Sequence, residues 1–226
     1  AWFDPTFRHF EPDFCNRHGT HTLGTILGLD PTTQDTIGVA FGAYWMAANA
    51  TCPARTTQDI IETFQWAIDP DGDSTTHDDM PDVITNSWTD GSLTNECQSS
   101  PYQDAVTALE AAGVALVFSA GNTGPNLSSI PPPKNINLDE VNTFTVGVIN
   151  GNTPLLNIIS FSSRGPSDCP ASGPLAIKPE VVAPGFQVRS AHTDGAYRSR
   201  SGTSMAAPHV SGALLLLKQA FPQLPG

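Results

Sequence analysis

Apolar runs of strand character alternate along this chain with amphipathic segments of helical character, and this alternation limits the fold more than any other feature. The strand-like runs are residues 44–50, 82–87, 114–119 and 143–149. In 57–68 the apolar residues recur three and four apart and share one helix face. In 102–112 a proline sits at the first turn and a glycine follows the end. Such alternation predicts an α/β protein with a mainly parallel sheet and helices on both faces.

Length and charge narrow the class further. The 226 residues suit one sizeable domain, 1–226. The formal net charge is −12, with Lys134, Lys178 and Lys218 as the lysines, which argues against nucleic-acid binding because that function requires a basic face. No apolar stretch approaches the roughly 20 residues that span a bilayer. We therefore expect one α/β domain with no nucleic-acid partner and no membrane span.

A candidate nucleophile lies in SGTSMAAPHVSGA (201–213), where Ser204 follows Gly202 at the start of a predicted helix. Gly202 permits a tight turn, and the free N–H groups at a helix start favour negative charge beside the serine oxygen. The simpler role for a serine at this place is N-capping of the helix. From this segment alone the two interpretations are equally supported.

Two histidines, His18 and His21, lie at the head of an apolar run in HGTHTLGTILG (18–28). The apolar residues of this run lie three and four apart, so we expect a helix from whose N-terminal end the His18 imidazole projects into a cleft. A histidine satisfied within the structure is the commoner case. Metal binding is the weakest option, because neither an HExxH glutamate nor a cysteine pair accompanies the two histidines.

The apolar run in VALVFSAGN (114–122) ends abruptly in small and polar residues. Such a run suits a buried parallel strand, and the loops at the carboxyl ends of such strands are where ligands and chemistry usually lie. The amide of Asn122 is therefore a candidate hydrogen-bond donor to a developing oxyanion. Taken alone, the segment is better explained as a Gly-Asn turn without a function.

Together these motifs, in the order His, Asn, Ser, resemble the subtilisin-like serine proteases. HGTH, SAGN and GTSMAAPH are long and correctly ordered, and the resemblance covers nearly the whole chain. The insertion at 69–88 and the tryptophan after Ser87 are most similar to the bacillopeptidase F-like branch. The resemblance implies a three-layer subtilisin-like fold, with a mainly parallel sheet flanked by helices, and serine endopeptidase activity on protein or peptide substrates.

The resemblance also implies a role for each site residue. Ser204 is the nucleophile that forms the acyl-enzyme, His18 is the general base, and Asn122 with the backbone N–H of Ser204 forms the oxyanion hole. The substrate binds as an extra extended strand between two walls of the specificity pocket. These walls are Ser87, Trp88 and Thr89 on one side and Ser119, Ala120 and Gly121 on the other. Trp88 is as readily explained as a packed aromatic, and Thr89 stands where the family commonly has glycine.

One departure from the family concerns the catalytic aspartate, which belongs to an Asp-Thr-Gly or Asp-Ser-Gly motif ahead of the histidine. No such motif precedes His18. Asp4 and Asp13 lack both a preceding apolar strand and a following Gly, and Asp35 lies in a polar loop that predicts a turn residue. We therefore expect the C-terminal portion of a catalytic domain, incomplete at its N-terminus. Loss of the orienting aspartate typically costs about 10⁴-fold in rate, so the chain alone should be nearly inactive.

The alternative from another class is a catalytically inactive peptide-binding module with the same fold. Intact His18, Asn122 and Ser204 argue against it, because an inactive site has no chemical need for all of them.

The cysteines are Cys15, Cys52, Cys97 and Cys169, and they form no CxxC pair. The resemblance brings Cys15 beside Cys52 and leaves Cys97 with Cys169. Disulfides imply an oxidising compartment and therefore secretion. Buried free thiols are the alternative.

An acidic stretch follows the first predicted helix, with Asp69, Asp71, Asp73, Asp78 and Asp79. Oxygen-rich loops can ligate calcium, but the glycine and glutamate of an EF-hand loop are missing, so a solvated loop is the favoured interpretation. We expect a secreted monomer that requires no cofactor, and we assign no calcium site.

Overall fold

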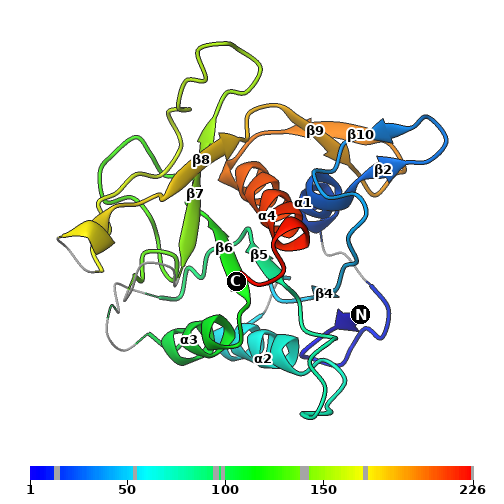
Figure 1. Cartoon of the computed structure of the whole chain (residues 1–226). Helices are drawn as coiled ribbons and strands as arrows, with labels where there is room; N and C mark the ends of the chain where they lie inside the picture. Colours follow the sequence, from blue (N-terminus) through cyan, green and yellow to red (C-terminus); the bar gives the residue numbers. More distant parts are fainter. Residues whose placement is uncertain are drawn as a thin grey trace.

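A four-stranded parallel sheet, ordered β5-β6-β7-β8, forms the centre of the molecule (Figure 1). The computed structural model describes residues 1–12, 16–52, 55–93, 97, 100–137, 143–169 and 173–224. The strands of this sheet are β5 (Val83–Asn86), β6 (Ala115–Ser119), β7 (Phe144–Ile149) and β8 (Val181–Pro184). The predicted α/β class with a parallel sheet is confirmed.

Helices cover both faces of this sheet (Figure 1). One face carries α2 (Thr57–Ile68) and α3 (Gln103–Ala111), and the other carries α4 (Thr203–Ala220), against which α1 (His18–Leu27) packs. Successive strand residues point to opposite faces, so Phe118 of β6 belongs to the core under α2 and α3, while Val117 belongs to the core under α4. The sheet is therefore buried on both sides, as its continuous apolar strands require.

Short pairs of strands lie outside the central sheet. β1 (Trp2–Phe3) pairs in parallel with β4 (Ala47–Ala48), and β2 (Leu29–Asp30) pairs antiparallel with β3 (Asp35–Thr36). β9 (Val188–Ala191) and β10 (Tyr197–Arg200) form an antiparallel hairpin, and a 3-10 helix, η1, spans Pro174–Ala176. None of the helices in the described ranges is both long and apolar enough to cross a membrane.

Three sequence predictions need correction. Asp4 does follow a strand, because β1 ends at Phe3, directly before it. The strand predicted at 44–50 is only the short β4, because its ladder partner β1 offers two residues. Asp35 was predicted to be a turn residue, and this is wrong. It pairs with Asp30 in the β2-β3 ladder, and its carboxylate lies 2.7 Å from the guanidinium of Arg189.

A disulfide joins Cys97 to Cys169, with the two Cα atoms 5.0 Å apart, which confirms the predicted pairing. Cys52 is also disulfide-bonded. Cys15 lies outside the described residues, so the pairing of Cys15 with Cys52 stays a prediction.

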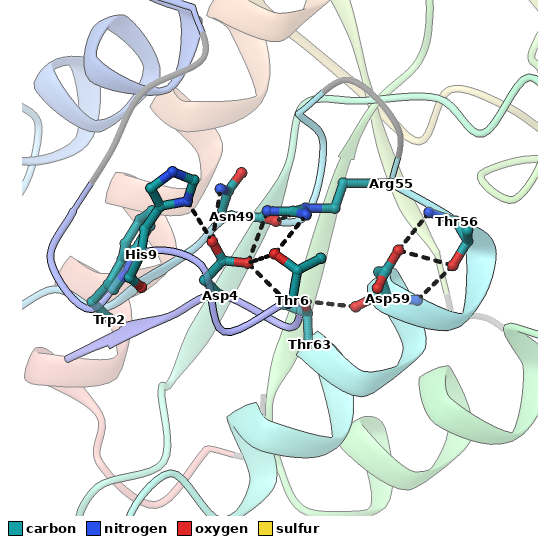
Figure 2. Close-up of polar contacts among 9 residues, drawn as sticks. All are labelled: Trp2, Asp4, Thr6, His9, Asn49, Arg55, Thr56, Asp59 and Thr63. Carbon is teal, nitrogen blue, oxygen red and sulfur yellow. Dashed lines mark hydrogen bonds and ion pairs between the residues drawn. The ribbon is translucent and has the colours of Figure 1, made fainter.

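A buried carboxylate, Asp4, ties the first residues of the chain to the segment before α2 (Figure 2). Its Oδ1 accepts hydrogen bonds from Arg55 Nη2 at 2.8 Å and from Thr6 N at 2.9 Å, and its Oδ2 lies 2.6 Å from His9 Nδ1. Arg55 Nε also donates to Asn49 O at 2.8 Å, beside β4. Burial by itself would raise the pKa of Asp4, but the hydrogen bonds from Thr6 and His9 and the charge of Arg55 hold that pKa far below its usual range.

Replacing Asp4 should therefore destabilise the protein strongly. Asp4→Asn leaves the Arg55 guanidinium buried without its carboxylate, and we expect a loss of about 3–5 kcal/mol in the free energy of unfolding, measured by urea denaturation at pH 7. Because the folded pKa of Asp4 is depressed, its contribution is present above the unfolded pKa of about 4 and declines as pH falls below it. The difference in the free energy of unfolding between wild type and Asp4→Asn should thus become smaller below pH 4. The exposed Asp78→Asn is the matched control, and an equal loss in both variants would contradict the role of the ion pair.

Candidate active site

Ser204 is the second residue of α4, directly after the turn from β10 through Gly202. Pro208 lies inside this helix and has no N–H to give to the carbonyl of Ser204, one turn earlier. That carbonyl instead accepts a hydrogen bond from Ser87 Oγ at 3.1 Å. The Ser204 hydroxyl lies 3.5 Å from Ser87 O. The first turn of α4 is thus anchored to the chain that leaves β5.

Asn122 follows β6, and its amide is held in one orientation by Thr203. Asn122 Oδ1 accepts hydrogen bonds from Thr203 N at 2.9 Å and from Thr203 Oγ1 at 3.1 Å, and Thr203 Oγ1 itself accepts from Gly121 N at 3.1 Å. Because Oδ1 is occupied, the amide group left to donate is Nδ2. It lies beside Gly202: a Cβ atom placed on this glycine would be 3.5 Å from Nδ2. The amide therefore presents a donor beside the start of α4.

His18 is the first residue of α1, and its backbone N–H donates to Asn16 Oδ1 at 2.8 Å. Burial lowers the pKa of the imidazole, and the positive charge of Arg200 lowers that pKa further. The ring is therefore neutral at neutral pH, which is the form that a general base requires. Among the described residues no hydrogen bond to this ring is formed.

The predicted catalytic residues converge on one pocket of about 300 Å³, although they are far apart in the sequence. Its lining residues are His18, Asn122, Arg200, Ser201, Gly202, Ser204 and Met205. A hydroxyl, a neutral imidazole and an oriented amide donor around one pocket are the groups that acyl transfer uses.

The two predicted substrate walls leave the sheet side by side. β5 and β6 are adjacent and parallel, with Asn86 opposite Phe118, so the 87–89 and 119–121 segments emerge at the same edge. Ser119, Ala120 and Gly121 are buried, and Thr89 is exposed. Trp88 packs against Tyr102 and Phe118, with ring centroids 5.8 Å away in each case, and donates Nε1 to Asn86 Oδ1 at 3.1 Å. Its contacts are those of a core aromatic.

Comparison with known sequences decides the family. The sequence model described as "Subtilase family" matches residues 4–226. The chain belongs to the subtilase family.

Individual relatives agree with this membership. The chain is 39% identical over 233 aligned positions to "Bacillopeptidase F" of Bacillus subtilis (strain 168), covering 99% of this chain and 15% of that protein. It is 33% identical to "Subtilisin DY" of Bacillus licheniformis, covering 92% of this chain and 66% of that protein. The chain thus spans a sixth to two thirds of the length of these relatives.

Solved structures confirm the subtilisin-like fold. "Sphericase" superposes with a TM-score of 0.79 at 27% identity, covering 98% of this chain and 71% of that one. A structure titled "Crystal structure of a cold adapted subtilisin-like serine proteinase" gives a TM-score of 0.73 at 28% identity, covering 100% of this chain and 70% of that one.

His21, the second histidine of HGTH, has a structural role in this subtilase. It is fully buried, and its Nε2 lies 3.1 Å from Val188 O and 3.0 Å from Arg198 O. Ser190 Oγ donates to His21 O at 2.8 Å. These contacts attach α1 to the β9-β10 hairpin and so hold His18 at the pocket.

Sequence reasoning missed Arg200, which lines the pocket and acts on His18 through its charge. Nothing in its sequence position signals this, because only the packing of the β9-β10 hairpin against α1 brings the guanidinium to the imidazole.

No group of His, Cys, Asp or Glu side chains suited to holding a metal ion occurs within the described ranges. The carboxylates of the acidic loop accept hydrogen bonds from its own backbone, from Asp71 N to Asp79 Oδ2 at 3.0 Å and from Asp73 N to Asp71 Oδ1 at 2.9 Å. The interpretation of this segment as a solvated loop stays a prediction.

The effect of the Arg200 charge on the pKa of His18 can be measured without any assay of activity. Arg200→Gln removes a positive charge that disfavours the imidazolium, so the pKa of His18 should rise. The measurement is an NMR pH titration of the His18 ring protons. Arg198→Gln is the control, since Arg198 is exposed and its side chain pairs with Asp194. An unchanged His18 pKa in Arg200→Gln, or an equal rise in both variants, would contradict the coupling.

Proposed function

We propose that this subtilase is a secreted serine endopeptidase that hydrolyses protein or peptide substrates by acyl transfer. The observation that carries the proposal is the convergence of Ser204, His18 and Asn122 on one pocket. Ser204 Oγ attacks the scissile carbonyl while His18 accepts its proton, and His18 then passes that proton to the leaving amine. Water, activated by the same imidazole, hydrolyses the acyl-enzyme.

In this mechanism Asn122 Nδ2 and the backbone N–H of Ser204 stabilise the tetrahedral oxyanion. The hydrogen bonds from Thr203 to Asn122 Oδ1 support this role because they orient the amide before substrate arrives. Ser204 N belongs to the first turn of α4, where the helix itself provides no acceptor. The substrate lies extended between the 87–89 and 119–121 segments.

The carboxylate that orients His18 is proposed to come from an extended apolar segment that is not among these 226 residues. A cavity of about 1340 Å³ runs between α1, α2, α4 and β5 and reaches His18. Its walls include the apolar face of α1, with Leu23 and Ile26, and Leu216 of α4, which is 45% exposed.

The edges of this cavity favour a strand as its occupant. In the described residues β5 pairs only with β6, and β4 pairs only with β1, so each has an edge with open backbone groups. A strand inserted there gains ladder hydrogen bonds and covers the apolar walls, and its end can place a carboxylate at the imidazole.

A fluorophosphonate probe tests the proposed nucleophile. In the full natural protein we expect covalent labelling of Ser204, lost in Ser204→Ala and in His18→Ala, since the hydroxyl needs its base. Ser201→Ala, in the same pocket, is the control and should still be labelled. The 226-residue chain alone should react about 10⁴-fold more slowly. Peptide binding by the full natural protein without labelling would instead support an inactive peptide-binding module.

Asn122→Asp tests the oxyanion hole with almost no change in shape. The variant keeps an oxygen for Thr203 but replaces the Nδ2 donor with a second acceptor, so kcat should fall by about 10²–10³-fold or more. KM should stay within a few-fold, because the lost contact forms mainly in the transition state. Steady-state kinetics on a chromogenic peptide measures both, with the exposed Asn126→Asp as control. A kcat within threefold of wild type would remove Asn122 from the mechanism.

A further inference from the structure

Among the described residues no carboxylate pairs with the buried Lys134, which lies next to one of the proposed substrate walls. Lys134 is only 1% exposed, and its Nζ lies 3.5 Å from Ser119 Oγ. Within the described residues this is the one hydrogen bond that the ammonium makes, and no ion pair accompanies it. Burial lowers the pKa of Lys134 to about 7, so the group titrates near neutral pH.

Lys178 is a second buried lysine, and it is paired with a carboxylate. Its Nζ lies 2.7 Å from Glu180 Oε1 and also donates to Thr143 O. Thr143 Oγ1 accepts a hydrogen bond from Lys178 Nζ and donates one to the backbone carbonyl of Lys134. Lys178 and Glu180 are thus the nearest charged groups in this network, and they pair with each other. A desolvated ammonium with one long hydroxyl contact is unfavourable, whereas one that meets a carboxylate is stabilised.

The position of Lys134 shows where such a carboxylate would enter. Ser119 ends β6 and begins the 119–121 segment, which leads directly into Asn122. The opposite wall begins at Ser87, which is hydrogen-bonded to Ser204. Ser119 is 2% exposed and Lys134 is 1% exposed, so a substrate carboxylate would reach the Ser119 hydroxyl and the ammonium behind it only by inserting past this wall.

We propose that Lys134 is a specificity-determining residue that pairs with the carboxylate of a substrate aspartate or glutamate next to the scissile bond. This inference rests on the proposed peptidase function. The substrate carboxylate accepts hydrogen bonds from Lys134 Nζ and Ser119 Oγ. It thus supplies the negative charge that Lys178 receives from Glu180 and that no described residue gives to Lys134. The enzyme is then selective for acidic residues at the acyl side of the cleaved bond.

The test uses the full natural protein and two peptide substrates that differ only in glutamate or glutamine before the scissile bond. At pH 6, where Lys134 is charged, we expect kcat/KM to favour glutamate by about 10- to 100-fold, the range of a hydrogen-bonded charge pair. The ratio should fall toward one at pH 9, because Lys134 loses its proton. Titration of His18 affects both substrates equally and cancels in the ratio.

Lys134→Met, close in length and apolar, should reduce the ratio at pH 6 to about one while hydrolysis of the glutamine substrate stays within threefold. Lys218→Met is the control, because the half-buried Lys218 lies near Asp82 rather than beside the substrate walls, and it should keep the wild-type ratio. A wild-type protein that cleaves both peptides equally at pH 6 overturns the inference without any variant, and so does a glutamate preference that survives in Lys134→Met. Both results leave the peptidase function standing, whereas absence of cleavage together with absence of fluorophosphonate labelling removes the function itself.

Discussion

The packing of α4 across the parallel sheet is the constraint on which the rest of the molecule depends. This helix contacts β5, β6, β7 and β8, and its completely buried residues Ala206 and Ala207 let its axis come close to the strands. The close approach sets the first turn of α4 at the carboxyl ends of β5 and β6. Thr203 then reaches Asn122, and Ser204 reaches Ser87. A bulkier residue at either alanine would move the nucleophile away from its amide donor.

Three buried charged side chains, Asp4, Lys178 and Lys134, have different surroundings in this protein. Asp4 is enclosed by Arg55, Thr6 and His9, and Lys178 is paired with Glu180. Within the described part of the chain, the partner of the Lys134 ammonium is a serine hydroxyl at 3.5 Å. The first two arrangements hold the structure together because each charge has its partner within the fold. The third lies at the proposed substrate groove, where a partner can arrive with the ligand.

Local patterns predicted much of the framework, and pairing across the chain decided the remainder. The helix predicted at 57–68 has those bounds, because its apolar spacing and the capping box of Thr56 with Asp59 act within a few residues. The strand predicted at 44–50 shortened to β4, and Asp35 entered a strand, since a ladder exists only where a second segment offers matching backbone groups. The network around Asp4 was not foreseen for the same reason, as Arg55 lies 51 residues away.

The sequence by itself determined the α/β class, because strand-like and helical runs alternate along it. It also determined the family and the three candidate catalytic residues, because these rest on short motifs around His18, Asn122 and Ser204. Only the tertiary structure decided which of their atoms face the pocket. It assigned Asn122 Oδ1 to Thr203, placed Arg200 beside His18 and used His21 to attach a hairpin. It also left Lys134 without a carboxylate from any residue that it describes. Hydrogen bonding, desolvation and Coulomb interactions depend on distance in space, which residue spacing along the chain does not specify.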